Sequence, residues 1–338
     1  MKFGLLSDPT FQLHRTVEHV ERPERLEAVL AALEEGDFGQ GFEPWRPREA
    51  TDEELLSCHR QEVLDRVNEL TELGGGNLDP DTYLNQHSER AARLSVGGGI
   101  DLCKAVMKGD LHRGFSLCRP PGHHATPTRS MGFCLYSTVA LVAKALRGVA
   151  QRILIFDWDV HHGNGTQDCL YHHAGTRFVS FHQSPMFPGT GYPDERGEGE
   201  GEGSIYNVPL PAGCGDGEYE AAYLKIVRPL IQQYDPQLII VSAGYDAHQK
   251  DLLGGMKVTR EGFARLAQLV AEDAESCAAQ GRLVGFLEGG YHLGGLAESV
   301  RATLEVWKGC YRGEAPRGGR VDDQVNRLLN QLASRYEL

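Results

Sequence analysis

Acidic residues and a histidine alternate in one short segment, since residues 157–161 read Asp-Trp-Asp-Val-His. If this segment ends a β-strand, residues two apart point to the same side, so Asp157, Asp159 and His161 share one face. Catalytic zinc takes three protein ligands from histidine, aspartate or glutamate and leaves a position open for water. We therefore expect a metal site here, with Asp246, in the segment Ser-Ala-Gly-Tyr-Asp-Ala-His at 242–248, as the third ligand from a neighbouring strand.

Two further segments could act on a molecule bound beside that metal. Residues 119–124 read Arg-Pro-Pro-Gly-His-His, so His123 and His124 lie in a turn that two prolines stiffen and Gly122 frees. Two imidazoles beside a metal suit proton transfer. Residues 287–291 read Leu-Glu-Gly-Gly-Tyr, and the phenol of Tyr291 could donate a hydrogen bond to a developing oxyanion.

Short apolar runs rich in β-formers precede each of these segments, and longer stretches with helical periodicity separate them. The predicted strands are 2–6, 115–118, 153–156, 178–181, 238–242 and 283–287, and predicted helices include 137–149, 219–234 and 260–279. Alternating strands and helices imply crossover connections and a largely parallel sheet. The fold class is therefore α/β, a largely parallel central sheet flanked by helices. Ligands bind beyond the carboxyl ends of such strands, where the polar segments fall.

Length alone leaves one or two domains possible, and the composition, with 41% of the 338 residues apolar and 24% charged, is that of a globular protein with enough apolar residues for a large core. We expect a single domain. We place this domain at residues 1–311. Residues 312–338 begin rich in glycine, proline and charge, and we expect a linker and a surface helix packed on the same domain.

Charge and cysteine usage narrow the possible partners and location. The net charge of -13 argues against binding to nucleic acid, although it could attract a cationic substrate. No apolar run is long enough to span a membrane, and the first residues turn polar too soon for a signal peptide. Eight cysteines without a Cys-x-x-Cys pair read as reduced thiols, so we expect a cytoplasmic protein.

Taken together, the motifs resemble the histone deacetylase and acetylpolyamine amidohydrolase family, within the arginase–deacetylase fold. The resemblance runs from about Glu21 to Tyr291. Two segments are similar to the class II branch and its bacterial relatives. They are residues 157–167, Asp-Trp-Asp-Val-His-His-Gly-Asn-Gly-Thr-Gln, and residues 132–134, Gly-Phe-Cys. The resemblance implies a zinc-dependent deacetylase that hydrolyses linear amide bonds. One zinc per chain would be held by Asp159, His161 and Asp246.

The same resemblance assigns catalytic roles to residues around the metal. It implies that His124 acts as general base and then acid, with His123 as its electrostatic partner. Asp157 would orient His123, and Asn164 would support His124. Tyr291 matches the tyrosine that polarises the acetyl carbonyl together with the metal.

The resemblance also implies a tunnel for an acetylated lysine side chain. The backbone of Gly132 would receive the substrate amide, Phe133 and Phe187 would form the walls, and Leu253 would lie at the rim. A structural potassium ion is a further implication of the family. Its ligands would come from Asp157, Asp159, His161, Ser180 and Phe181.

The sequence departs from the family pattern at three positions. Ser137 stands where an asparagine is usual, Leu252 replaces a common proline before the rim leucine, and Val20 interrupts the usual His-Pro-Glu-Arg-Pro opening. None of these changes removes a reacting group, so they bear on the shape of the rim and the choice of substrate.

Three other functions compete with a protein lysine deacetylase. An acetylpolyamine amidohydrolase would use the same site on a small acetylated amine, but Leu253 stands where an acidic gatekeeper would be expected. A two-manganese, arginase-like enzyme would need a carboxylate where Gly163 stands. A non-catalytic reader of acyl-lysine would have lost a ligand or Tyr291, and all are present. The oligomeric state is open, since family members occur as monomers, dimers and tetramers.

Overall fold

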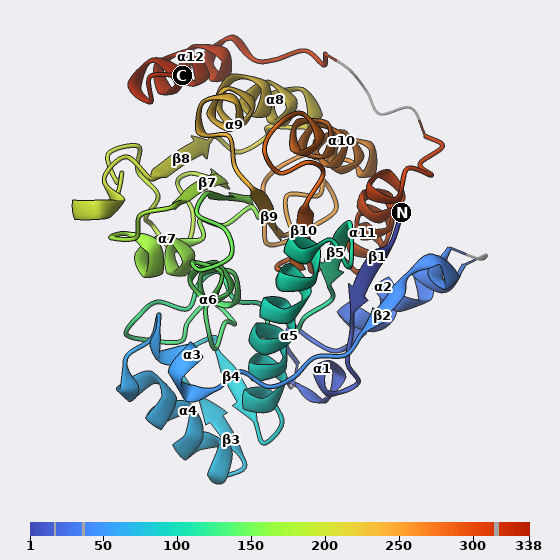
Figure 1. Ribbon diagram of the computed structural model, residues 1–338, viewed down its shortest axis with the longest axis vertical. Coiled ribbons are helices and arrows are strands. Elements are labelled where there is room, and N and C mark those ends of the chain that lie inside the picture. The colour runs from blue at the N-terminus through green and yellow to red at the C-terminus, as the bar shows by residue number, and fades with distance from the viewer. Residues whose placement is uncertain (17, 36–37, 314–317) are drawn as a thin grey trace.

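An eight-stranded sheet forms the centre of the molecule, and every neighbouring pair of its strands is parallel (Figure 1). The computed structural model describes residues 1–16, 18–35, 38–313 and 318–338. Across the sheet the strands are β2 (Glu43–Trp45), β1 (Phe3–Leu6), β5 (Arg113–Ser116), β10 (Leu283–Leu287), β9 (Leu238–Ala243), β6 (Ile153–Asp157), β7 (Thr176–Gln183) and β8 (Ile205–Leu210). The predicted largely parallel α/β sheet is confirmed.

The six predicted strands all occur, because their apolar runs are the pattern of strands buried on both faces. Every residue of β6, β9 and β10 is buried. The two strands of this sheet that were not predicted, β2 and β8, lie at its edges and contain Pro44 and Pro209. Proline within a strand weakens the sequence signal, and an edge strand tolerates it because one side of its backbone needs no partner.

Helices cover both faces of the sheet, as two consecutive residues of β10 show. A Cβ atom on Gly99 of α5 would overlap the ring of Phe286, whereas one on Gly285 would meet Trp307 of α11. Successive strand residues point to opposite faces, so α5 and α11 lie on opposite sides. The helices are α1 (Thr10–Leu13), α2 (Glu24–Glu34), α3 (Asp52–Leu56), α4 (Gln61–Glu72), α5 (Ser88–Lys108), α6 (Thr138–Ala145), α7 (Asn164–Leu170), α8 (Asp216–Ala222), α9 (Arg228–Tyr234), α10 (Arg260–Ser276), α11 (Leu293–Lys308) and α12 (Asp323–Arg335).

The predicted helices are present with shifted bounds. The stretch 219–234 is divided between α8, a π-helical segment at Tyr223–Val227 and α9. Helix α12 contacts α8, the π-helical segment and β8. The domain boundary after residue 311 stays a prediction, and residues 314–317 of the expected linker lie outside the described part of the chain.

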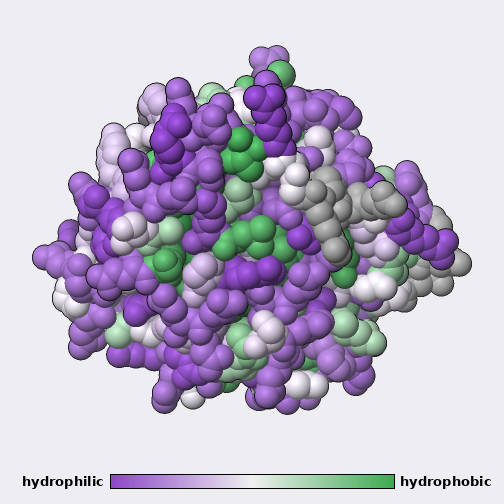
Figure 2. Space-filling view, turned by 90° about the horizontal axis from the view of Figure 1, so that it is seen from above, coloured by the Kyte–Doolittle hydropathy of each residue, from purple (hydrophilic) through white to green (hydrophobic). Residues whose placement is uncertain are grey.

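A small antiparallel ribbon and the outer surface complete the fold. Strands β3 (Gly75–Asn77) and β4 (Tyr83–Asn85) pair with each other, and their connection carries Asp81 and Thr82. The face seen in Figure 2 is mostly hydrophilic, with hydrophobic residues in small separate patches. Within the described ranges, no helix combines the length and the hydropathy needed to cross a membrane.

Candidate active site

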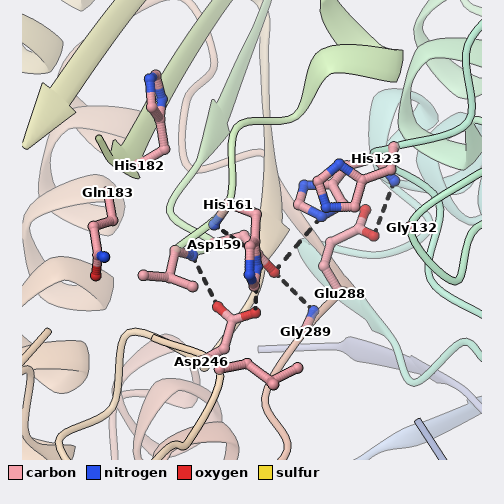
Figure 3. A network of polar contacts seen from close by, with 12 residues as sticks. His123, Gly132, Asp159, His161, His182, Gln183, Asp246, Glu288 and Gly289 are labelled. Carbon is pink, nitrogen blue, oxygen red and sulfur yellow. Dashed lines mark hydrogen bonds and ion pairs between the residues drawn. The ribbon is translucent and has the colours of Figure 1, made fainter. Parts of the chain in front are cut away.

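Four adjacent strands in the middle of the sheet deliver the polar segments to one edge. Strands β5, β10, β9 and β6 are neighbours in that order, and because they are parallel their carboxyl ends meet. The segments that follow them are 119–125, 288–292, 244–248 and 157–167. Residues far apart in the chain therefore form one site, which Figure 3 shows from close by.

Asp159, His161 and Asp246 form a group of buried side chains that could hold a metal ion, with ligand atoms within 4.8 Å of one another. The Nδ1 atom of His161 lies 3.1 Å from Asp159 Oδ1 and 3.2 Å from Asp246 Oδ2, and both carboxylates point toward the His161 ring in Figure 3. Backbone amides orient the carboxylates, since Gly289 N–H donates to Asp159 Oδ2 over 2.8 Å and Val160 N–H donates to Asp246 Oδ1 over 2.8 Å.

The electrostatics of this group suit a bound cation. Both aspartates are fully buried, and burial, followed by the charge of Asp159, raises the pKa of Asp246 to about 7. Two carboxylates in one desolvated site repel each other, and a cation between them removes that cost. Two carboxylates and an imidazole form a donor set that zinc accepts, with one coordination position left open.

The adjacent histidines have different partners. His123 Nδ1 lies 3.0 Å from Asp157 Oδ2, whereas His124 Nδ1 donates to the amide oxygen of Asn164 over 2.8 Å. Burial lowers the pKa of His123, but the carboxylates of Asp159 and Asp157 outweigh it and raise this pKa well above the ordinary value. The side chains that were predicted to orient each histidine are therefore in contact with them.

His124 has the opposite electrostatic environment. Burial, followed by the charges of His123 and His161, lowers the pKa of His124 well below the ordinary value. Because the Asn164 oxygen can only accept, the proton of neutral His124 is on Nδ1 and its Nε2 carries a free lone pair. Two histidines whose pKa values diverge in this way suit one charged and one basic role.

Tyr291 packs against the guanidinium group of Arg25. Arg25 lies over its ring at 4.8 Å, and the guanidinium also donates to Gly290 O over 2.6 Å and to Glu288 O over 2.5 Å. Burial raises the pKa of Tyr291 well above the ordinary value. The side chain is therefore a protonated phenol at neutral pH and can donate a hydrogen bond.

A tunnel of about 290 Å³ leads to these groups, and all four predicted substrate-binding residues line it. Its lining is Asp81, His124, Gly132, Phe133, His161, Met186, Phe187, Leu253 and Tyr291. The ring of Phe187 meets that of His124 edge-on at 5.1 Å, and Phe133 meets Tyr291 at 5.7 Å. The lining therefore combines apolar side chains, among them Phe133, Met186 and Phe187, with the polar groups of His124, His161 and Tyr291.

The histone deacetylase domain matches residues 19–307 of this chain. The chain belongs to the histone deacetylase family. Histone deacetylase 15 of Arabidopsis thaliana is 39% identical over 297 residues, which cover 86% of this chain and 53% of that protein. A histone deacetylase-like amidohydrolase of Pseudomonas aeruginosa is 38% identical over 277 residues, covering 81% of this chain and 72% of that protein.

Structural comparison agrees with the sequence match. The crystal structure of the HDA15 HD domain superposes with a TM-score of 0.92 at 34% identity, covering 99% of this chain and 94% of that chain. The chain spans 53% and 41% of the length of two of its curated relatives, histone deacetylase 15 and histone deacetylase HDA1 of Candida albicans. The family and the names of the relatives make this domain a hydrolase of amide bonds.

Several residues of this deacetylase-family site were not predicted. Glu288 accepts hydrogen bonds from Gly122 N–H over 2.7 Å and His123 N–H over 3.2 Å, so it holds the histidine turn. A glutamate directly after an apolar strand was the available signal for it. The contacts of Arg25 and the position of Asp81 in the tunnel had no comparable local signal.

The potassium ion stays a prediction. Asp157 lies opposite Ser180 in the register of β6 and β7, and Phe181 follows on the same strand. These three of the five expected ligands are therefore neighbours in the sheet, but this arrangement does not identify an ion. The cytoplasmic location also stays a prediction; the eight cysteines are free thiols.

Proposed function

We propose that this protein is a zinc-dependent hydrolase that removes acetyl groups from the ε-amine of lysine in peptides or proteins. The observation that carries the proposal is a mostly apolar cavity whose lining includes His124, Tyr291 and His161, the last of which belongs to the metal-ligand group. A neutral base, a phenol donor and a carboxylate–imidazole triad are the groups that amide hydrolysis by activated water requires.

Asp159, His161 and Asp246 would hold the zinc ion. When bound, zinc would supply a Lewis acid and lower the pKa of a water molecule to about 7. The backbone hydrogen bonds from Gly289 and Val160 keep the carboxylates in position for this role. We assign proton transfer to His124 and the stabilisation of developing negative charge to His123 and Tyr291.

His124 would accept a proton on Nε2 during attack and then pass it to the leaving amine. The hydrogen bond from its Nδ1 to Asn164 keeps Nε2 free, and its lowered pKa keeps it unprotonated at neutral pH. His123, paired with Asp157, would remain charged and stabilise negative charge that develops nearby. General acid–base catalysis of this kind contributes roughly 10²–10⁴ in rate.

Tyr291 would donate its phenolic proton in a hydrogen bond to the oxyanion. The cation of Arg25 over its ring and the two carbonyl contacts of Arg25 fix the tyrosine loop. Removal of one such donor typically costs about 2.7–4 kcal/mol of transition-state stabilisation.

The tunnel would select the substrate by its charge. An acetylated lysine side chain is neutral and can lie between Phe133 and Phe187, which face the cavity. A free ammonium group would lose its hydration in the same passage at a high cost in free energy.

A second candidate function is an acetylpolyamine amidohydrolase, and one observation favours it. Asp81 lines the tunnel, so an acidic side chain is present there although Leu253 occupies the expected gatekeeper position. A carboxylate at this place could attract the free amines of a polyamine. The same carboxylate could equally attract a lysine-rich peptide, so the two functions need a direct comparison.

The test measures acetate release by the zinc-loaded protein from an acetyl-lysine peptide and from N-acetylated polyamines. We expect faster cleavage of the peptide, and we expect Tyr291→Phe to lower kcat by roughly 100-fold or more while zinc content is unchanged. Tyr192→Phe makes the same chemical change at a side chain that is 57% exposed and should keep full activity. Faster cleavage of the polyamines would move the function to small amines, and no release from either substrate would overturn the proposal.

A further inference from the structure

The side chain of Asp251 connects the loop of Tyr291 with the rim of the tunnel. Its Oδ2 atom accepts hydrogen bonds from Tyr291 N–H over 2.6 Å and from His292 N–H over 2.9 Å. Its Oδ1 atom accepts from Leu253 N–H over 3.0 Å. The residue is only 6% exposed, so these three bonds form largely out of water.

The tyrosine loop depends on such contacts for its conformation. Gly289 and Gly290 precede Tyr291, and Gly290 has a φ of +118°, in a region that side chains rarely adopt. Glycines add conformational freedom, so the loop needs fixed partners outside its own sequence. Near the metal-ligand group, Gly289 is fixed by Asp159 and by Tyr245 N–H, which donates to its carbonyl over 3.0 Å. At the tunnel side, Asp251 bonds to the amide of Tyr291 itself.

We propose that Asp251 is a positioning residue for deacetylation, which acts by holding the backbone of Tyr291 and coupling it to Leu253 at the tunnel rim. This inference rests on the proposed function, because it concerns the placement of the phenol that would donate to the oxyanion. Asp251 does not line the tunnel, so it acts through the residues that do.

The carboxylate is suited to this role and an amide is not. Hydrogen bonds to an ionised acceptor are shorter and stronger than neutral ones, and both carboxylate oxygens can accept. In Asp251→Asn one oxygen becomes an NH₂ group, which would face either Leu253 N–H or the amides of Tyr291 and His292. A buried donor would then lose its acceptor, and the loop would shift to relieve the contact.

A double-mutant cycle tests whether the effect passes through the tyrosine. Kinetics of acetate release are measured for the wild type, Asp251→Asn, Tyr291→Phe and the double variant. We expect Asp251→Asn to lower kcat by roughly 10- to 100-fold, the range expected for a displaced catalytic group. In the Tyr291→Phe background the same substitution should lower kcat by less than about threefold, because coupled residues do not act additively.

Asp273→Asn is the matched control. Asp273 is 7% exposed and also accepts several hydrogen bonds, from Tyr223 Oη over 2.9 Å and Arg228 Nε over 3.0 Å, but it does not line the tunnel. If Asp273→Asn lowers kcat, it does so through reduced stability alone. The factor should therefore be the same with Tyr291 and with Tyr291→Phe. If Asp251→Asn does not fold, Asp251→Glu is the second variant: it keeps the charge, but its side chain is one methylene longer and displaces the carboxylate from the amides of Tyr291 and Leu253. Its loss of kcat should again be smaller in the Tyr291→Phe background.

The possible outcomes separate this inference from the function on which it rests. If the wild type releases no acetate from either substrate, the proposed function fails and the role of Asp251 fails with it. If the wild type is active and Asp251→Asn lowers kcat by the same factor with and without the Tyr291 hydroxyl, the inference alone is overturned. The inference is supported if Asp251→Asn lowers kcat when Tyr291 is present and has little effect in the Tyr291→Phe background.

Discussion

Gly132 is packed so tightly against His124 that its replacement should disable the base without unfolding the protein. Gly132 has a φ of +56°, and an added Cβ atom would lie 2.5 Å from Cδ2 and 2.7 Å from Cγ of the His124 ring. The shorter distance is about 0.9 Å less than the 3.4 Å at which ordinary van der Waals contact begins. Gly132→Ala must therefore move the ring or the backbone by close to 1 Å.

This displacement sets the expected size of the effect. A catalytic group misplaced by about 1 Å can cost roughly 100-fold in rate, so kcat of Gly132→Ala should fall by about that factor. The left-handed conformation should lower the free energy of unfolding by about 1–2 kcal/mol, with a further loss from the contact with His124. The assay is steady-state acetate release, with urea unfolding and zinc content measured on the same sample.

Gly109→Ala is the control that separates the backbone strain of a left-handed alanine from the contact with the His124 ring. Gly109 ends α5 with a φ of +83°, and nothing lies within 4 Å of its added Cβ. It should lose a similar 1–2 kcal/mol of stability from the left-handed conformation and keep full activity. If folded, zinc-loaded Gly132→Ala retained wild-type kcat, then either His124 would not be the base or its position would not depend on this contact.

Three further predictions concern pH, metal and the tunnel wall. His59 Nδ1 donates to Thr126 O over 2.9 Å and its Nε2 accepts from Ser137 N–H over 2.9 Å, and burial lowers its pKa from 6.5 to about 4. The unfolded chain therefore takes up a proton at higher pH than the folded protein, so the free energy of unfolding should fall by about 3 kcal/mol as pH drops through this range. Urea titrations should show a flatter pH dependence for His59→Gln, and equal slopes would contradict the assignment. Chelation should lower the melting temperature, because zinc at a hundredfold excess over its Kd stabilises a protein by about 2.7 kcal/mol. Asp246→Asn should not respond to zinc or chelator, and an unchanged response would remove Asp246 from the ligand set. Phe187→Ala should lower kcat/KM for the peptide by about tenfold, since loss of roughly 1–2 kcal/mol of apolar contact is expected from removing this wall. Its melting temperature should change little because Phe187 is 43% exposed, and unchanged kcat/KM would show that the ring does not contact substrate.

The sequence by itself determined six of the eight strands of the sheet and the polar segments that follow them. Apolar runs such as Ile153–Asp157 are local signals, because a strand buried on both faces must be apolar throughout. The alternation of Asp157, Asp159 and His161 is also visible in the sequence alone, although only Asp157 belongs to β6 and the other two lie in the segment that follows it. The approach of Asp246 was also expected, since parallel strands end at one edge.

Only the tertiary structure decided which side chains hold these residues in place. Arg25 donates to Gly290 O across 265 positions of the chain, and Glu288 accepts from Gly122 N–H across 166. Asp251 binds the amide of Tyr291, forty residues later in the sequence, although it shares no motif with it. Such contacts leave no periodic trace in the sequence, because a buried polar group requires a partner but does not specify where along the chain that partner lies. Local pattern therefore selects the reacting groups, and long-range packing sets their geometry.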